Sequence, residues 1–319
     1  MQDRSASEGA AMFRHLRFQE IDRYRSLVPE ARLQFTQTGP GLLNGQAMAY
    51  RSSALTLLRL RMEAPAILCS ETPADLVIFA FTLSDNGEVC FNGERLEPGA
   101  LAFVDGAGGY TTRGRRRDVM LAAFDRQAFK RDLAALRGDE LREHASPALM
   151  EAPSSTLTLV RRTALDLLSA AGSGLARAPA LERRELDLRD ALLDLALPLD
   201  TGRGAGLSPR DIVAWANEVC VRKGSFSISV ADLCRGVGVS RSTLHRAFWE
   251  VCGTAPSTYL SFRRMTEARR MLLGGQPERG AVKRAAIDSG HRELGRFSVE
   301  YRRIFGESPT ATLNRESSD

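Results

Sequence analysis

The sequence predicts an α+β protein with a strand-rich N-terminal domain, a helical connector and an all-helical C-terminal domain. Two observations predict this fold class. Short β-type segments separated by turn residues dominate the chain up to about residue 125, and helical spacing follows them. A length of 319 residues is sufficient for two domains.

The N-terminal domain is expected at residues 16–135, after a flexible segment at residues 1–15. Apolar and charged residues alternate at 58–62, as on a half-buried strand, and residues 76–83 are rich in β-branched and aromatic side chains. Asn92-Gly93 between two β-type segments is typical of a type I′ hairpin turn. These closely spaced strands and turns predict a small sandwich or barrel.

Some residues of this domain are candidates for binding a small molecule. Several aromatic side chains are expected to face the interior of the barrel, where ordinary core packing is the alternative role: Phe79, Phe81, Phe91, Phe103 and Phe124. The candidate effector-binding residues combine two of these aromatics with polar residues near strand ends: Arg59, Arg61, Phe79, Phe81, Asp105 and Tyr110.

The connector is expected at residues 136–206. Helical spacing covers residues 155–171 and 181–197, and leucines surround much of the second helix. Such a helix is buried between partners, either in the core of this chain or at a dimer interface, and the sequence leaves both open. Residues 200–206, DTGRGAG, have the composition of a flexible linker and mark the domain boundary.

The C-terminal domain is expected at residues 207–319. It contains 18 Lys or Arg and 12 Asp or Glu, a net charge of +6, whereas the rest of the chain contains 26 and 27, a net charge of −1. This asymmetry favours a polyanionic partner such as nucleic acid, with a solvated basic surface as the alternative.

Two segments of this domain repeat one pattern. A short helix, a glycine turn and a second helix with apolar residues three or four positions apart are expected at 229–250 and again at 277–305. This pattern indicates a helix-turn-helix, whose second helix lies in the major groove. A helix at 256–273 joins the two units, and its length of about 27 Å suits two major grooves about 34 Å apart.

These segments resemble the DNA-binding domain of the AraC/XylS family of bacterial transcription regulators. The similarity lies in SVADLCRGVGVSRSTLHRAF, GTAPSTYLSFRRMTEARRML and GHRELGRFSVEYRRIFGESPTATL. The sequence at residues 294–298 and 309–313 is similar to that of regulators of the ethanolamine-operon kind. The N-terminal domain resembles the cupin-like sensor domains that precede this module.

The resemblance implies base readers on the exposed face of each second helix. They are Ser240, Arg241, Ser242, His245 and Arg246 in the first unit, and Glu293, Leu294, Gly295, Arg296, Ser298 and Val299 in the second. Arg246 and Arg296 are the best candidates, because arginine binds guanine bidentately. Possible phosphate contacts are the arginines of the joining helix: Arg263, Arg264, Arg269 and Arg270.

The second unit departs from the family pattern at two positions. Ala285 stands where a bulky aliphatic is usual, and His291 stands where an aromatic is usual. We interpret His291 as a half-buried turn residue that fills the place of that aromatic. The smaller and more polar packing predicts a less stable second unit.

The resemblance further implies double-stranded DNA and RNA polymerase as partners, an activating role, and control by a small molecule or partner at the N-terminal domain. A homodimer is possible. The alternatives are a regulator that binds only other proteins and, less favoured, a cupin-type enzyme. Because no His, Cys or carboxylate cluster and no nucleophile motif occurs, we expect no metal, no cofactor and no enzymatic activity. No membrane span or signal peptide is evident, so a cytoplasmic location is expected.

Overall fold

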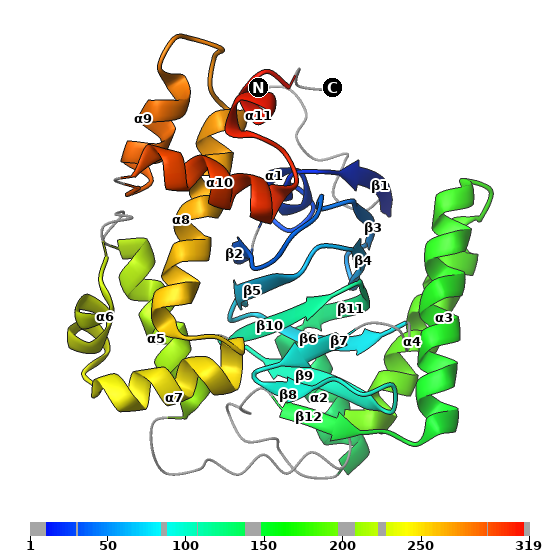
Figure 1. Ribbon diagram of the computed structural model, residues 1–319. Coiled ribbons are helices and arrows are strands. Elements are labelled where there is room, and N and C mark those ends of the chain that lie inside the picture. The colour runs from blue at the N-terminus through cyan, green and yellow to red at the C-terminus, as the bar shows by residue number, and fades with distance from the viewer. Residues whose placement is uncertain are drawn as a thin grey trace, which may run out of the picture.

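The computed structural model describes residues 11–29, 31–83, 88–106, 108–137, 148–196, 208–222, 228–291 and 293–315. Antiparallel strands form the N-terminal part and helices form the C-terminal part (Figure 1). This is the predicted two-domain α+β class. The expected boundary at residues 200–206 lies outside the described residues.

The strands form two antiparallel sheets, the larger with the order β1-β3-β4-β11-β6-β9-β12 and the smaller with the order β2-β5-β10-β7-β8. The strands are β1 (Met12–Phe18), β2 (Arg32–Gln37), β3 (Gly45–Arg51), β4 (Leu55–Met62), β5 (Ala66–Glu71), β6 (Leu76–Thr82), β7 (Glu88–Phe91), β8 (Glu94–Arg95), β9 (Ala100–Asp105), β10 (Gly109–Arg115), β11 (Arg117–Asp125) and β12 (Ala148–Glu151).

The predicted hairpin at Asn92-Gly93 is confirmed. β7 pairs with β8, and the turn residues have φ values of 50° at Asn92 and 98° at Gly93. Positive φ at both positions is the requirement of the type I′ turn.

The expectation for residues 1–15 is wrong in its last part. β1 begins at Met12 and pairs with β3 along its whole length, from Met12 opposite Arg51 to Phe18 opposite Gly45. Backbone pairing orders this segment although four of its seven residues are exposed. Residues 1–10 lie outside the described part.

The larger sheet has two apolar faces, which corrects the expected orientation of the aromatics. Phe79, Phe81, Phe103 and Phe124 pack with the helices on its outer face, and Phe91 alone of the five packs between the sheets. Alternate residues of one strand point to opposite faces. Because the intervening residues are also apolar, the pattern alone could not assign the faces.

Helices α2 (Arg126–Arg137), α3 (Ser154–Ser173) and α4 (Ala178–Ala196) pack against this outer face. α3 and α4 lie side by side along one edge of the molecule (Figure 1). Most leucines of α4 are buried in the same apolar cluster: Leu181, Leu188, Leu192, Leu193 and Leu195. The core role is therefore the observed one for these leucines, whereas Leu186 is 52% exposed.

The remaining helices are α1 (Ile21–Arg25) in the N-terminal domain and α5 (Pro209–Arg222), α6 (Val230–Val237), α7 (Arg241–Cys252), α8 (Pro256–Leu273), α9 (Ala281–Asp288), α10 (Leu294–Phe305) and α11 (Pro309–Leu313) in the C-terminal domain. α5 and α7 pack on β10, and α8 packs on β2. The smaller sheet is therefore covered by the C-terminal helices. No described helix has both the length and the apolar character that spanning a bilayer demands.

Asp105 anchors α2 to the larger sheet. It is 3% exposed and forms ion pairs with Arg126 at 2.6 Å and with Lys130 at 2.7 Å. We predict that Asp105→Ala lowers the free energy of unfolding of the N-terminal domain by about 3–5 kcal/mol, because two cations lose their buried counter-charge. Denaturant unfolding measures this change.

Glu97→Ala is the matched control, because the Arg95–Glu97 pair is exposed and should contribute less than about 1 kcal/mol. Equal effects of the two substitutions would contradict an anchoring role for Asp105.

Candidate nucleic-acid interface

Local capping defines the first helix-turn-helix unit, α6 and α7. Ser229 and Asp232 form a capping box at the start of α6, and Gly238 ends that helix with a φ of 76°. Ser240 then caps α7 by accepting a hydrogen bond from the Thr243 amide at 3.1 Å. Only one residue, Val239, separates the C-cap of α6 from the N-cap of α7.

The second unit, α9 and α10, begins later than predicted. Residues 277–280 precede α9, because Gly280 adopts a φ of 84° at the N-cap. The turn depends on Ser289, which is fully buried and donates a hydrogen bond to the Ala285 carbonyl at 2.7 Å. Phe297 and Tyr301 of α10 are buried with Ala285 of α9 in one apolar cluster formed by α8 to α11.

α8 joins the two units over Pro256–Leu273, the range that the sequence predicts. Its 18 residues give a length of about 27 Å. The second helices of the units, α7 and α10, are called the recognition helices below.

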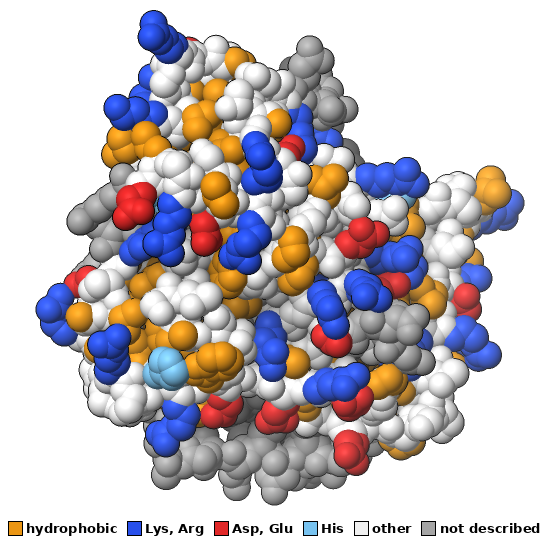
Figure 2. Space-filling model, in the orientation of Figure 1, with side chains coloured by type: hydrophobic (Ala, Val, Ile, Leu, Met, Phe, Trp, Pro, Cys, Tyr) orange, Lys and Arg blue, Asp and Glu red, His pale blue; other side chains and the backbone are white. Residues whose placement is uncertain are grey.

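Every residue expected to read DNA is exposed. The residues are Ser240, Arg241, Ser242, His245 and Arg246 in the first unit and Glu293, Leu294, Gly295, Arg296, Ser298 and Val299 in the second. The face over the C-terminal helices carries Lys and Arg side chains among apolar ones (Figure 2). Both recognition helices are therefore accessible, and their contact with DNA remains a prediction.

Trp249 is a surface feature of α7 that the sequence reasoning missed. It is 54% exposed, and its indole Nε1 donates a hydrogen bond to Nε2 of His245 at 3.3 Å. Its spacing, four residues after His245 and three after Arg246, is the signal that could have placed it on the same helix face.

The four arginines of α8 are engaged within the protein. Arg263 donates to Gln34 of β2, and Arg264 donates to the Ile228 carbonyl at 2.9 Å. Arg269 is buried against Glu307 at 2.7 Å, and Arg270 pairs with Glu267 at 2.5 Å. Phosphate contact by these arginines stays a prediction, and it would require exchange of the partners described here.

The candidate effector-binding residues do not converge on one pocket. Arg59 and Arg61 both contact Asp118, at 2.8 Å and 3.4 Å, and Asp105 pairs with α2. Phe79 and Phe81 are fully buried in the core under α2 to α4. Tyr110 lies apart, on the smaller sheet, where it stacks on Phe91 with the ring centroids 5.5 Å apart.

Arg117 is a polar residue of the space between the sheets that the sequence reasoning missed. It is 3% exposed, and its Nη1 donates to Oγ1 of Thr112 at 2.9 Å. Among the described residues no carboxylate pairs with it, and burial lowers its pKa to about 10. Arg117 is the last residue of a basic segment at residues 113–117, and the other arginines of this segment are more exposed. The sequence pattern alone did not distinguish the buried arginine from the exposed ones.

His291 fills the turn of the second unit as expected. Its ring packs on Phe297 with the centroids 4.9 Å apart, and Nδ1 lies 3.0 Å from Oγ of Ser289. Burial, aided by the positive charge of Arg264, lowers the pKa of His291 below its ordinary value of 6.5. The folded second unit therefore favours the neutral imidazole.

This pKa shift predicts loss of stability in acid. The free energy of unfolding is highest above the ordinary pKa of 6.5. It decreases as the pH falls from that value through the lowered pKa of the folded state, because the unfolded chain then binds the proton more readily. From about pH 7.5 to about pH 5.5, the melting temperature of the wild-type protein should fall more steeply than that of His291→Phe. Parallel pH profiles of the two proteins would refute this role of His291.

Comparison with known proteins agrees with this geometry. Residues 233–315 match the family model described as a helix-turn-helix domain. Over 86 residues the chain is 38% identical to the probable thc operon regulatory protein of Rhodococcus erythropolis, covering 27% of this chain and 26% of that protein. Over 88 residues it is 33% identical to the XylDLEGF operon transcriptional activator 2 of Pseudomonas putida, covering 28% of this chain and 56% of that protein.

The alignments thus span about a quarter of the first relative and just over half of the second. The crystal structure of the AraC-like transcriptional activator CuxR superposes with a TM-score of 0.44 and 13% identity, over 81% of this chain and 95% of that one. Geometry and sequence similarity together identify residues 233–315 as a helix-turn-helix domain and support the resemblance to AraC/XylS-type regulators.

Proposed function

We propose that this chain is a sequence-specific DNA-binding transcription regulator that reads two adjacent major grooves. The observation that carries the proposal is the pair of exposed recognition helices, α7 and α10, joined by the single helix α8. The names of the relatives, a probable operon regulatory protein and a transcriptional activator, favour activation of transcription over an enzymatic role. RNA polymerase would then be a second partner, and the site of action would be the cytoplasm.

We further propose that a small molecule or a protein partner acts on the N-terminal domain. A cavity of about 130 Å³ lies between this domain and α8, and a small molecule bound there would contact both domains. Its walls include Phe35 of β2, Arg263 of α8 and Phe305 of α10. Homodimer formation and the narrower resemblance to ethanolamine-operon regulators remain predictions.

The test of the proposed function begins with selection of binding sites from a random pool of duplex DNA by the full-length protein. Enrichment of one sequence supports the proposal. Recovery of unrelated sequences with equal affinity would leave only non-specific binding by a basic surface.

Arg246→Ala should weaken binding to the selected site by about 1–3 kcal/mol and relax the preference at one base pair, because bidentate contact with guanine would be lost. Titration of the selected site and of its single-base variants measures both effects. Arg235→Ala on α6 is the control, because Arg235 is exposed but lies outside the recognition helices. A uniform loss on every DNA sequence would instead assign Arg246 to phosphate.

A further inference from the structure

The two helix-turn-helix units are attached to the N-terminal domain by different interactions. Phe248 of the first unit and Tyr259 at the start of α8 share one buried apolar cluster with Ile67 and Cys69 of β5. The apolar cluster of the second unit contains residues of α8 to α11 and none from the N-terminal domain among the described residues. The described hydrogen bond between the N-terminal domain and α10 is a polar contact outside these two apolar clusters.

Gln37, the last residue of β2, makes this contact. Its side-chain Nε2 donates to the carbonyl of Ile304, near the end of α10, at 3.0 Å, and the residue is 3% exposed. The last four carbonyls of a helix have no partner within the helix. A side chain of the N-terminal domain thus satisfies one of the free carbonyls of the second recognition helix.

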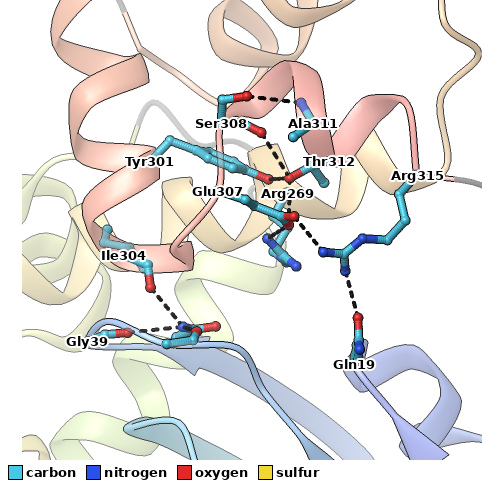
Figure 3. Close-up of polar contacts among 12 residues, drawn as sticks. Gln19, Gly39, Arg269, Tyr301, Ile304, Glu307, Ser308, Ala311, Thr312 and Arg315 are labelled. Carbon is cyan, nitrogen blue, oxygen red and sulfur yellow. Dashed lines mark hydrogen bonds and ion pairs between the residues drawn. The ribbon is translucent and has the colours of Figure 1, made fainter.

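The same amide also holds its own loop. Nε2 lies 3.0 Å from the Gly39 carbonyl and 2.8 Å from the Gly41 carbonyl, and the Gln37 backbone amide donates to Oγ1 of Thr266 on α8 at 3.2 Å. Figure 3 shows the Ile304 and Gly39 carbonyls directed at this side chain. One residue therefore connects the loop after β2, the joining helix and the recognition helix.

A second polar contact lies on the surface of the same junction. Arg315 donates to Oε1 of Gln19 at 3.0 Å and pairs with Glu307 at 2.5 Å, and Glu307 also pairs with Arg269 of α8 (Figure 3). Exposed polar side chains of this kind readily replace their protein partners with water. The buried amide of Gln37 is the contact that can define the position of α10.

We propose that Gln37 is a positioning residue of DNA recognition, through which the N-terminal domain sets the separation of the two recognition helices. This inference rests on the proposed function, since it concerns how the same two helices meet DNA. Gln37 also borders the cavity between the N-terminal domain and α8. A molecule in that cavity would act on α10 through this amide.

The test compares the full-length wild type with Gln37→Asn, which retracts the amide by one methylene, and with Gln37→Leu, which removes it. Hydrogen–deuterium exchange in α10 should become about tenfold faster in both variants, while exchange in α7 stays unchanged. Gln46→Asn on β3 is the matched control, because that amide makes no hydrogen bond to α8–α11 among the described residues.

On the selected DNA, the wild type should distinguish the selected spacing of the two half-sites from one lengthened by about two base pairs. Both Gln37 variants should lose about tenfold of this discrimination and keep their affinity for the half-site of α7.

If Gln37→Leu does not fold, Gln37→Asn decides the outcome. Unchanged exchange in α10, equal acceleration of α7 and α10, or unchanged spacing discrimination would each overturn the proposal. If the wild type selects no DNA sequence, the proposed function fails, and the exchange measurement still decides the role of Gln37.

Discussion

The packing of the C-terminal helices on the smaller sheet is the contact on which the rest of the architecture depends. Ile67 and Cys69 of β5 belong to the buried cluster of α5, α7 and the start of α8. A large apolar side chain buried in this way contributes roughly 1.5–3 kcal/mol, whereas a hydrogen bond contributes about 0.5–1.5 kcal/mol net. The first recognition unit is therefore the firmly attached one, and the second depends on a few polar contacts around Gln37.

This packing also decides what the charged residues do. α8 packs on β2 and against helices of both helix-turn-helix units, so Arg263 and Arg269 are used inside the protein. Net charge in the last third indicated nucleic acid, but part of that charge stabilises the junction between domains. The arginines of the recognition helices, Arg246 and Arg296, remain on the surface.

Features set by local chemistry could be predicted from the sequence. The caps at Ser229 and Ser240, the hairpin at Asn92-Gly93 and the bounds of α8 depend on residues close together in the chain. Features set by pairing between distant segments could not be predicted. The strand at Met12–Phe18 needs β3 as its partner, and the outward orientation of Phe79 and Phe81 needs the helices that cover them. The role of Gln37 likewise depends on a contact across 267 residues of chain.

The central claim is that one sheet holds two exposed recognition helices in fixed relation, so that both meet the same face of DNA. Hydroxyl-radical footprinting of the full-length protein on its selected site tests this claim most directly. The account predicts two protected patches on one face of the duplex, about 10 base pairs apart, one for each major groove. A single protected patch, or two patches on opposite faces of the duplex, would contradict it.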